Sequence, residues 1–92
     1  MRAYEITAVL QESPASLVDE TKNTIKEFFK KYSVEMTEEE DWGSKKLWHT
    51  IRGLETGHYS HFKCKAEPSA IAKLENEFKL NQNILRSLVI KV

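Results

Sequence analysis

One stretch decides how this sequence folds: Asp41-Trp42-Gly43-Ser44-Lys45-Lys46-Leu47. An acidic run over residues 38–41 ends at a tryptophan and a glycine, two lysines follow, and the chain then turns apolar. Glycine inside a strand usually marks a bulge or a bend. The stretch therefore predicts a long strand that is interrupted at Gly43, and few small folds need such a strand.

The size and charge of the chain limit what it can do. Its 92 residues predict a single domain over 1–92. A chain of this length buries only about 60–65% of the surface that its unfolded form exposes, which leaves little room for a deep substrate cavity. Fourteen basic residues balance fourteen acidic ones, so the chain alone should attract nucleic acid weakly. Docking on RNA beside a basic partner stays compatible with this balance.

The sequence predicts a soluble protein of the cytoplasm. Its single cysteine, Cys64, cannot form an internal disulfide, which favours a reducing compartment. No apolar run approaches the roughly 20 residues that a membrane-spanning helix needs. The first residues are charged and alternate as in a strand, unlike a secretory signal.

Alternating apolar residues predict four strands, over 3–10, 34–51, 59–66 and 84–92. In the first strand, the apolar side is made by Tyr4, Ile6, Ala8 and Leu10. In the second, the residues expected to share one face past the glycine are Leu47, His49 and Ile51. In the third, the inward side is expected to be Ser60, Phe62, Cys64 and Ala66. Each strand should therefore bury one of its sides.

Helical spacing predicts two helices. The first begins at Ser13-Pro14, where proline suits the first helical position, or at Ser16, with Asp19 completing a capping box. Its apolar stripe is Leu17, Thr21, Ile25, Phe28 and Tyr32. The second helix begins at Pro68, and its stripe is Ile71, Leu74 and Phe78.

Two helices with one apolar stripe each need a sheet to lie on. The order β-α-β-β-α-β predicts an α+β fold, the ferredoxin-like sandwich, in which both helices cover one face of a four-stranded antiparallel sheet. Right-handed crossovers leave the other face free, and we expect this open face to be the working surface. Gly53 and Gly57 should bracket the hairpin connection between the two middle strands.

The reactive residues do not form a catalytic or metal-binding set. His58 and His61 are three apart on a strand and point to opposite sides, and no nearby Cys or Asp completes a set with His49. Cys64 is expected to face the helices as an inert buried thiol. The acidic run lacks the spacing of a calcium loop, so a solvated bend is favoured, with contact to a basic partner as the alternative. We expect no enzyme, metal, cofactor, small-molecule substrate or membrane.

Basic and aromatic residues predict a contact surface on the open face. Basic groups at strand ends around an open sheet can clamp phosphates, with ordinary solubilising charge as the alternative. The basic candidates for RNA contact are Arg2, Lys45, Lys46, Arg52, Arg86 and Lys91. Exposed tryptophans often mark a contact surface. The candidates for contact with a protein partner are Trp42, Trp48, Tyr59 and His61.

Six motifs occur in order along essentially the whole chain: Arg2-Ala3-Tyr4-Glu5, Asp41-Trp42-Gly43, Lys45-Lys46-Leu47, Gly57-His58-Tyr59, Glu67-Pro68 and Leu85-Arg86-Ser87-Leu88-Val89. Together they resemble the bacterial ribosomal protein S6 family of the small subunit. The resemblance implies the ferredoxin-like fold and binding to the central domain of small-subunit ribosomal RNA (rRNA), as a heterodimer with the small basic ribosomal protein S18.

The resemblance also implies which residues contact rRNA. The positions that match the family's motifs are Arg2, Tyr4, Lys45, Lys46 and Arg86, although the parity of Tyr4 favours the core. Two departures concern the second strand and the hairpin. Ser44 stands where the family commonly has a basic residue, and Leu47-Trp48-His49-Thr50-Ile51 stands where it often reads Leu-Ala-Tyr-Pro-Ile. The second departure bears on partner contact.

Two other functions use the same fold. A free-standing single-strand RNA binder of the RNA-recognition-motif type is faintly suggested by residues 57–62, but Thr56 replaces its basic residue, and Tyr59 and Phe62 face opposite sides. A small dimeric ferredoxin-like enzyme would need a convergent acid/base or nucleophile set. A structural ribosomal protein is favoured over both.

Overall fold

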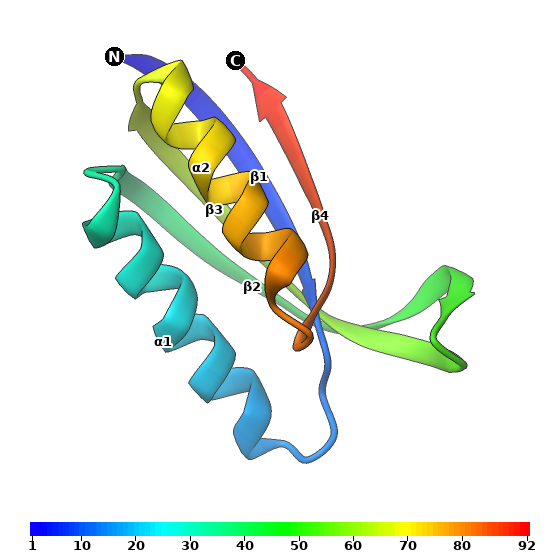
Figure 1. Ribbon diagram of the computed structural model, residues 1–92. Helices are drawn as coiled ribbons and strands as arrows, with labels where there is room; N and C mark the ends of the chain where they lie inside the picture. The colour runs from blue at the N-terminus through cyan, green and yellow to red at the C-terminus, as the bar shows by residue number, and fades with distance from the viewer.

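The structure, a computed structural model, describes all residues, 1–92. Its elements are β1 (Arg2–Leu10), α1 (Ser16–Lys31), β2 (Glu35–Ile51), β3 (Leu54–Ala66), α2 (Pro68–Leu80) and β4 (Ile84–Lys91). The strands form one antiparallel sheet in the order β2-β3-β1-β4, and both helices lie on the same side of it (Figure 1). The predicted ferredoxin-like α+β fold is confirmed. Neither helix is long and apolar enough to cross a membrane.

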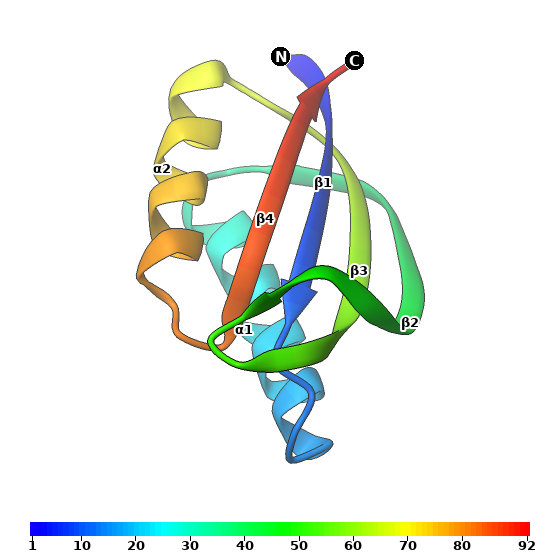
Figure 2. The same ribbon diagram turned by 90° about the vertical axis from the view of Figure 1, so that its right-hand side faces the viewer.

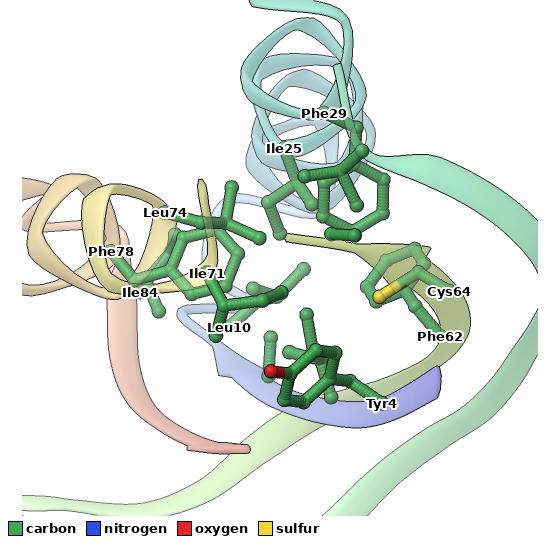
Figure 3. Close-up of a cluster of buried hydrophobic side chains, with 14 of the residues drawn as sticks. Tyr4, Leu10, Ile25, Phe29, Phe62, Cys64, Ile71, Leu74, Phe78 and Ile84 are labelled. Carbon is green, nitrogen blue, oxygen red and sulfur yellow. The ribbon is translucent and has the colours of Figure 1, made fainter. Parts of the chain in front are cut away.

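The core lies between the helices and the inner face of the sheet. The predicted apolar side of β1 is buried there, as are the predicted inward residues of β3, which are at most 2% exposed. Ile25 and Phe29 reach the sheet from α1, and Ile71, Leu74 and Phe78 reach it from α2 (Figure 3). Alternation along β1 and β3 was a sufficient guide because each strand has one covered side.

The first helix begins at the second of the two predicted starts, but without the predicted capping box. It starts at Ser16 with Ala15 as its N-cap, and no side chain caps it. The N–H of Leu17 donates to the carbonyl of Pro14 at 2.9 Å, and the N–H of Val18 donates to the carbonyl of Ala15 at 3.2 Å. These turn-like backbone bonds satisfy two of the N–H groups that the first turn of a helix leaves without an intrahelical partner.

The buried side of α1 is rotated by about one residue from the predicted stripe. Its buried residues are Val18, Thr21, Ile25 and Phe29. Phe29 packs edge-on against Phe62 of the sheet, with ring centroids 5.4 Å apart. The ring of Phe28 instead faces α2, with its centroid 6.3 Å from that of the Phe78 ring. The helix thus packs against two elements, and the sheet takes the residue next to the predicted one. The predicted stripe of α2, by contrast, is confirmed.

The predicted interruption of β2 at Gly43 is confirmed. Its register against β3 shifts between Asp41 and Gly43, and Gly43 has a φ of 75°. This is the left-handed region that glycine enters without strain, so the bulge explains why a glycine stands in the strand.

The hairpin connection differs from the prediction. The turn is made by Arg52 and Gly53, with φ of 52° and 78°, and β3 already begins at Leu54. Positive φ at both central residues is the geometry of a two-residue hairpin turn. The register also slips between Lys46 and Ile51, so Leu47 is buried while His49 is exposed. We call residues 46–56 the hairpin arm.

The hairpin arm leaves the sheet on the side away from the helices (Figure 1) and passes across one end of the sheet when seen from that side (Figure 2). Gly57 lies at its root. A Cβ atom there would lie 2.6 Å from Val9 Cγ1 and 3.4 Å from Leu47 Cδ2, so this close approach requires glycine. Val9 is consequently only 5% exposed. The face predicted to be open is therefore covered at one end by the chain itself.

Candidate RNA and protein interface

The sheet face away from the helices is the candidate interface, and we call it the open face. Its side chains are Glu5, Thr7 and Val9 of β1, Glu38, Glu40 and Lys45 of β2, Tyr59, His61, Lys63 and Lys65 of β3, and Arg86, Leu88 and Ile90 of β4. Leu88 and Ile90 are 53% and 50% exposed. Large apolar groups at this exposure have no covering partner within the chain.

His61 is held at the centre of the open face. Its Nε2 donates to the Glu5 carboxylate at 3.0 Å, and its Nδ1 accepts from the Thr7 hydroxyl at 2.9 Å. We assign this tautomer because a carboxylate only accepts. The Trp42 indole stacks on the imidazole, with ring centroids 4.5 Å apart and planes 10° apart. His61, predicted as a contact residue, therefore supports Trp42 from beneath and is itself 7% exposed.

Trp42 combines local packing with an exposed surface. Its Nε1 donates to the Glu40 carboxylate at 3.0 Å, yet the residue is 40% exposed. Lys45 Nζ lies 5.2 Å from the centroid of the Trp42 ring and 5.8 Å from that of Tyr59. Such cation–π contacts keep the ammonium group beside the aromatic surface. Of the two readings left open for Trp42, local packing is shown by the stack on His61, and contact with a partner stays a prediction.

The acidic run forms ion pairs within the chain. Three pairs hold it: Asp41 with Lys22 at 2.5 Å, Glu39 with Lys26 at 3.2 Å, and Glu38 with Lys63 at 3.2 Å. The hydrogen bond from Lys22 lowers the pKa of Asp41 to about 2. The hydrogen bond to Glu38 raises the pKa of Lys63. The acidic run is exposed to solvent, in agreement with the favoured reading of a solvated bend, and two of its three pairs also tie β2 to α1.

A hollow of about 310 Å³ lies where the first loop, α1 and β2 meet, and its polar groups engage one another. His58 Nε2 lies 2.6 Å from Asp41 Oδ1, and Glu12 accepts from Thr56 at 2.6 Å and from Ser44 at 3.0 Å. These two hydroxyls lower the pKa of Glu12. Glu12 and Asp41 already hold their donors, so they do not form a convergent acid/base set for the enzyme alternative.

Glu12, Ser44 and Thr56 form a cluster that joins the first loop to β2 and β3 near the root of the hairpin arm. The sequence did not predict this cluster. Ser44 and Thr56 lie 32 and 44 residues from Glu12 along the chain. No local pattern links residues so distant. Only the pairing register of β2 and β3 brings them together.

The single thiol of the chain lies on the opposite side of the sheet from the open face. No group of three or more His, Cys, Asp or Glu side chains is arranged to hold a metal ion. Cys64 is buried on the helix side, as predicted, and burial raises the pKa of its thiol to about 11. A thiol with so high a pKa is a poor nucleophile at neutral pH.

The predicted basic residues divide between two ends of the sheet. Arg2 and Lys91 lie beside the termini, where the N–H of Val92 donates to the carbonyl of Ala3 at 3.0 Å. The other four lie toward the hairpin arm: Lys45, Lys46, Arg52 and Arg86. Arg52 Nη1 donates to the Gln82 carbonyl at 2.6 Å, which fastens the arm to the turn before β4. The cations thus form two separate groups.

Two aromatic candidates have opposite exposures. Tyr4 is 7% exposed within the core, so the contact with rRNA that the resemblance implied has no surface to act through. Its even position in β1 turns it toward the helices. Trp48, in the hairpin arm, is 91% exposed and free to meet a partner.

Comparisons with known proteins agree with the motifs in the sequence. The family model described as ribosomal protein S6 matches residues 3–91. "Small ribosomal subunit protein bS6" of Leptospira biflexa is 50% identical over 91 residues, covering 99% of this chain and 97% of that protein. The protein of the same name in Desulforudis audaxviator is 33% identical over 95 residues, covering 99% and 98%.

Solved structures support the fold. The 30S ribosomal protein S6 of Thermotoga maritima superposes with a TM-score of 0.90 at 17% identity, over 99% of this chain and 87% of that one. The C-terminal domain of MgtC from Mycobacterium tuberculosis also superposes, with a TM-score of 0.65 at 8% identity, over 100% and 88%. Since proteins with different names share the fold, fold alone does not assign function, and the sequence matches carry the family.

Proposed function

Because this chain belongs to the ribosomal protein S6 family, we propose that it binds the central domain of small-subunit rRNA as a heterodimer with ribosomal protein S18. Membership makes the chain a structural protein of the small ribosomal subunit, placed on the cytoplasmic ribosome, and not an enzyme. Beyond this role, we propose S18 as the partner and the central domain as the bound segment of rRNA.

The open face carries the proposal. Trp42, Leu88 and Ile90 stand between 40% and 53% exposed on a face that the chain's own helices do not cover. Contiguous exposed apolar groups rimmed by polar residues mark interaction surfaces. A protein partner that covers this face would bury them, and Trp48 would extend the contact along the hairpin arm.

The charge balance explains why a partner is needed for RNA binding. The formal net charge is zero, and three lysines are already paired with carboxylates of the acidic run. Phosphate contacts are left to the exposed cations at the two ends of the sheet, Arg2 and Lys91 at one and Lys45, Lys46 and Arg52 at the other. So few contacts give weak affinity at physiological salt, and a basic partner supplies the remainder.

Binding to a central-domain rRNA fragment tests the proposal directly. Titrations compare this chain alone, S18 alone and the two together, over a series of salt concentrations. We expect weak binding by the chain alone and tight binding by the pair. Equal affinity with and without the chain would remove the proposed role.

A matched pair of double variants locates the phosphate contacts. Replacing Lys45 and Lys46 by Ala should reduce the salt slope of the ternary complex by up to about 0.7–0.9 for each lost phosphate contact. Replacing Lys30 and Lys31, an adjacent lysine pair at the end of α1, should leave the slope unchanged. An unchanged slope in the first variant would remove Lys45 and Lys46 from the RNA interface.

The RNA-recognition-motif alternative loses support from the placement of its aromatic residues. Phe62 is fully buried in the core, while Tyr59 lies on the opposite side of the sheet. Stacking several bases requires aromatic rings on one exposed face. The chain does not offer that platform.

A further inference from the structure

We infer that a small pocket on the open face receives an aliphatic side chain of the protein partner, and that Arg86 beside it pairs with an adjacent Asp or Glu carboxylate of the same partner segment. This inference rests on the proposed heterodimer with S18. It assigns Arg86, until now a candidate for rRNA contact, to the protein interface.

The pocket lies over β1, between Tyr59 of β3 and the β4 residues Arg86 and Leu88. Its lining residues are Thr7, Val9, Tyr59, Arg86 and Leu88, and its volume is about 170 Å³. Sites for whole small molecules usually span about 300–1,000 Å³. The pocket is smaller than that range, and most of its lining is apolar, so a single aliphatic side chain is the better fit.

The charges around the pocket call for an anion. Glu5 accepts from His61, Glu38 pairs with Lys63, and Glu40 accepts from Trp42, so each of these carboxylates on the open face already has a partner. Arg86 forms no ion pair within the chain. Unmatched positive charge at the rim of an interface favours an acidic group on the partner and fixes its register.

A carboxylate is favoured over an RNA phosphate by the apolar surroundings of Arg86. Leu88 lies two residues after Arg86 on β4 and is half exposed. Ile90, also half exposed, follows on the same side of the strand. A phosphate backbone has no apolar groups that could cover this row. A protein segment can bury Leu88 and Ile90 while its carboxylate reaches Arg86, which is how interfaces combine an apolar centre with a polar rim.

The test measures the dissociation constant for purified S18 without RNA, using Arg86→Glu and Leu88→Ala. Each should weaken the heterodimer about tenfold or more, because truncation at the centre of an interface is costly and charge reversal opposes a carboxylate. The effect of Arg86→Glu should shrink as salt rises. Matched controls are Lys73→Glu and Leu80→Ala, exposed positions on α2 that should bind S18 as the unaltered chain does. Circular dichroism melting checks that all four variants fold.

The outcomes separate this inference from the function on which it rests. Suppose Arg86→Glu binds S18 normally, and Arg86→Ala instead lowers the salt slope of the rRNA complex. Arg86 would then contact phosphate, and the inference would be wrong while the heterodimer stood. Normal binding by Leu88→Ala would remove the pocket. No binding of S18 by the unaltered chain would overturn the proposed function together with the inference.

Discussion

The Trp42 indole lies nearly parallel on the His61 imidazole, 4.5 Å away between ring centroids. Hydrogen bonds to Thr7 and Glu5 fix the orientation of the His61 imidazole. The stack therefore holds the Trp42 ring at a defined position on the open face. The bulge at Gly43 adjoins this tryptophan. The residue that we propose as a partner contact is thus already positioned in the free chain, which would reduce the entropy lost when a partner binds.

A double-mutant cycle should detect this stack. The free energies of unfolding of Trp42→Ala, His61→Ala and the double variant, measured in urea, should give a coupling energy of about 0.5–1.5 kcal/mol. Trp48 supplies the control because it is 91% exposed. A cycle between Trp48→Ala and His61→Ala should be additive within about 0.3–0.5 kcal/mol. Equal coupling in the two cycles would contradict the stack.

Gly57→Ala should displace the root of the hairpin arm. The added Cβ would meet Val9 Cγ1 at 2.6 Å, and Val9 is a stiff β-branched residue that is nearly buried. Overpacking of this kind costs about 1–3 kcal/mol of the free energy of unfolding. Val9→Ala removes the obstructing methyl groups, so the double variant should lose less stability than the sum of the two single losses.

Gly43→Ala is the control for the arm. Nothing lies within 4 Å of a Cβ built there, but the φ of 75° disfavours alanine. Its cost, of about 1 kcal/mol, should come from the backbone alone and should not change when Val9 becomes alanine. Full additivity between Gly57→Ala and Val9→Ala would show that the arm does not rest on Val9.

Asp41 should make stability depend on pH in the acid range. Its pKa falls from 3.8 to about 2 on folding, first because Lys22 donates to it, so the unfolded state binds more protons between these values. The contribution is complete above about pH 4 and is lost as pH falls through about 2. Since the side chain is 49% exposed, screening should limit it to about 1 kcal/mol or less.

Urea denaturation between pH 2 and 7 measures this contribution. Asp41→Asn should be less stable than the unaltered chain at neutral pH, and the difference should close toward pH 2. Lys22→Gln should reproduce most of this behaviour because it removes the largest cause of the shift. A difference that stays constant over the whole range would argue against the pair.

Ser60→Ala should leave stability unchanged or raise it by up to about 2 kcal/mol. The Ser60 hydroxyl is fully buried and has no hydrogen-bond partner, so folding costs its desolvation without return. Thr21 is an equally buried hydroxyl that donates to the Leu17 carbonyl at 2.7 Å. Thr21→Val should lower stability by about 0.5–1.5 kcal/mol. Thermal melting of both variants decides, and a clear loss in Ser60→Ala would point to a partner for its hydroxyl.

The sequence by itself determined the order of elements, the inward sides of β1 and β3, the stripe of α2 and the bulge at Gly43. Each follows from a period of two or 3.6 residues, or from one glycine, and these are properties of neighbours along the chain. The motifs also identified the family without any geometry.

Only the tertiary structure decided the rest. It turned Phe29 rather than Phe28 toward the sheet, paired Asp41 with Lys22, and stacked Trp42 on His61. It also set the hairpin turn at Arg52 and bent the arm over Val9. These contacts join residues far apart in sequence. They depend on strand register and on the coiling of the sheet, which a local pattern of residues does not encode.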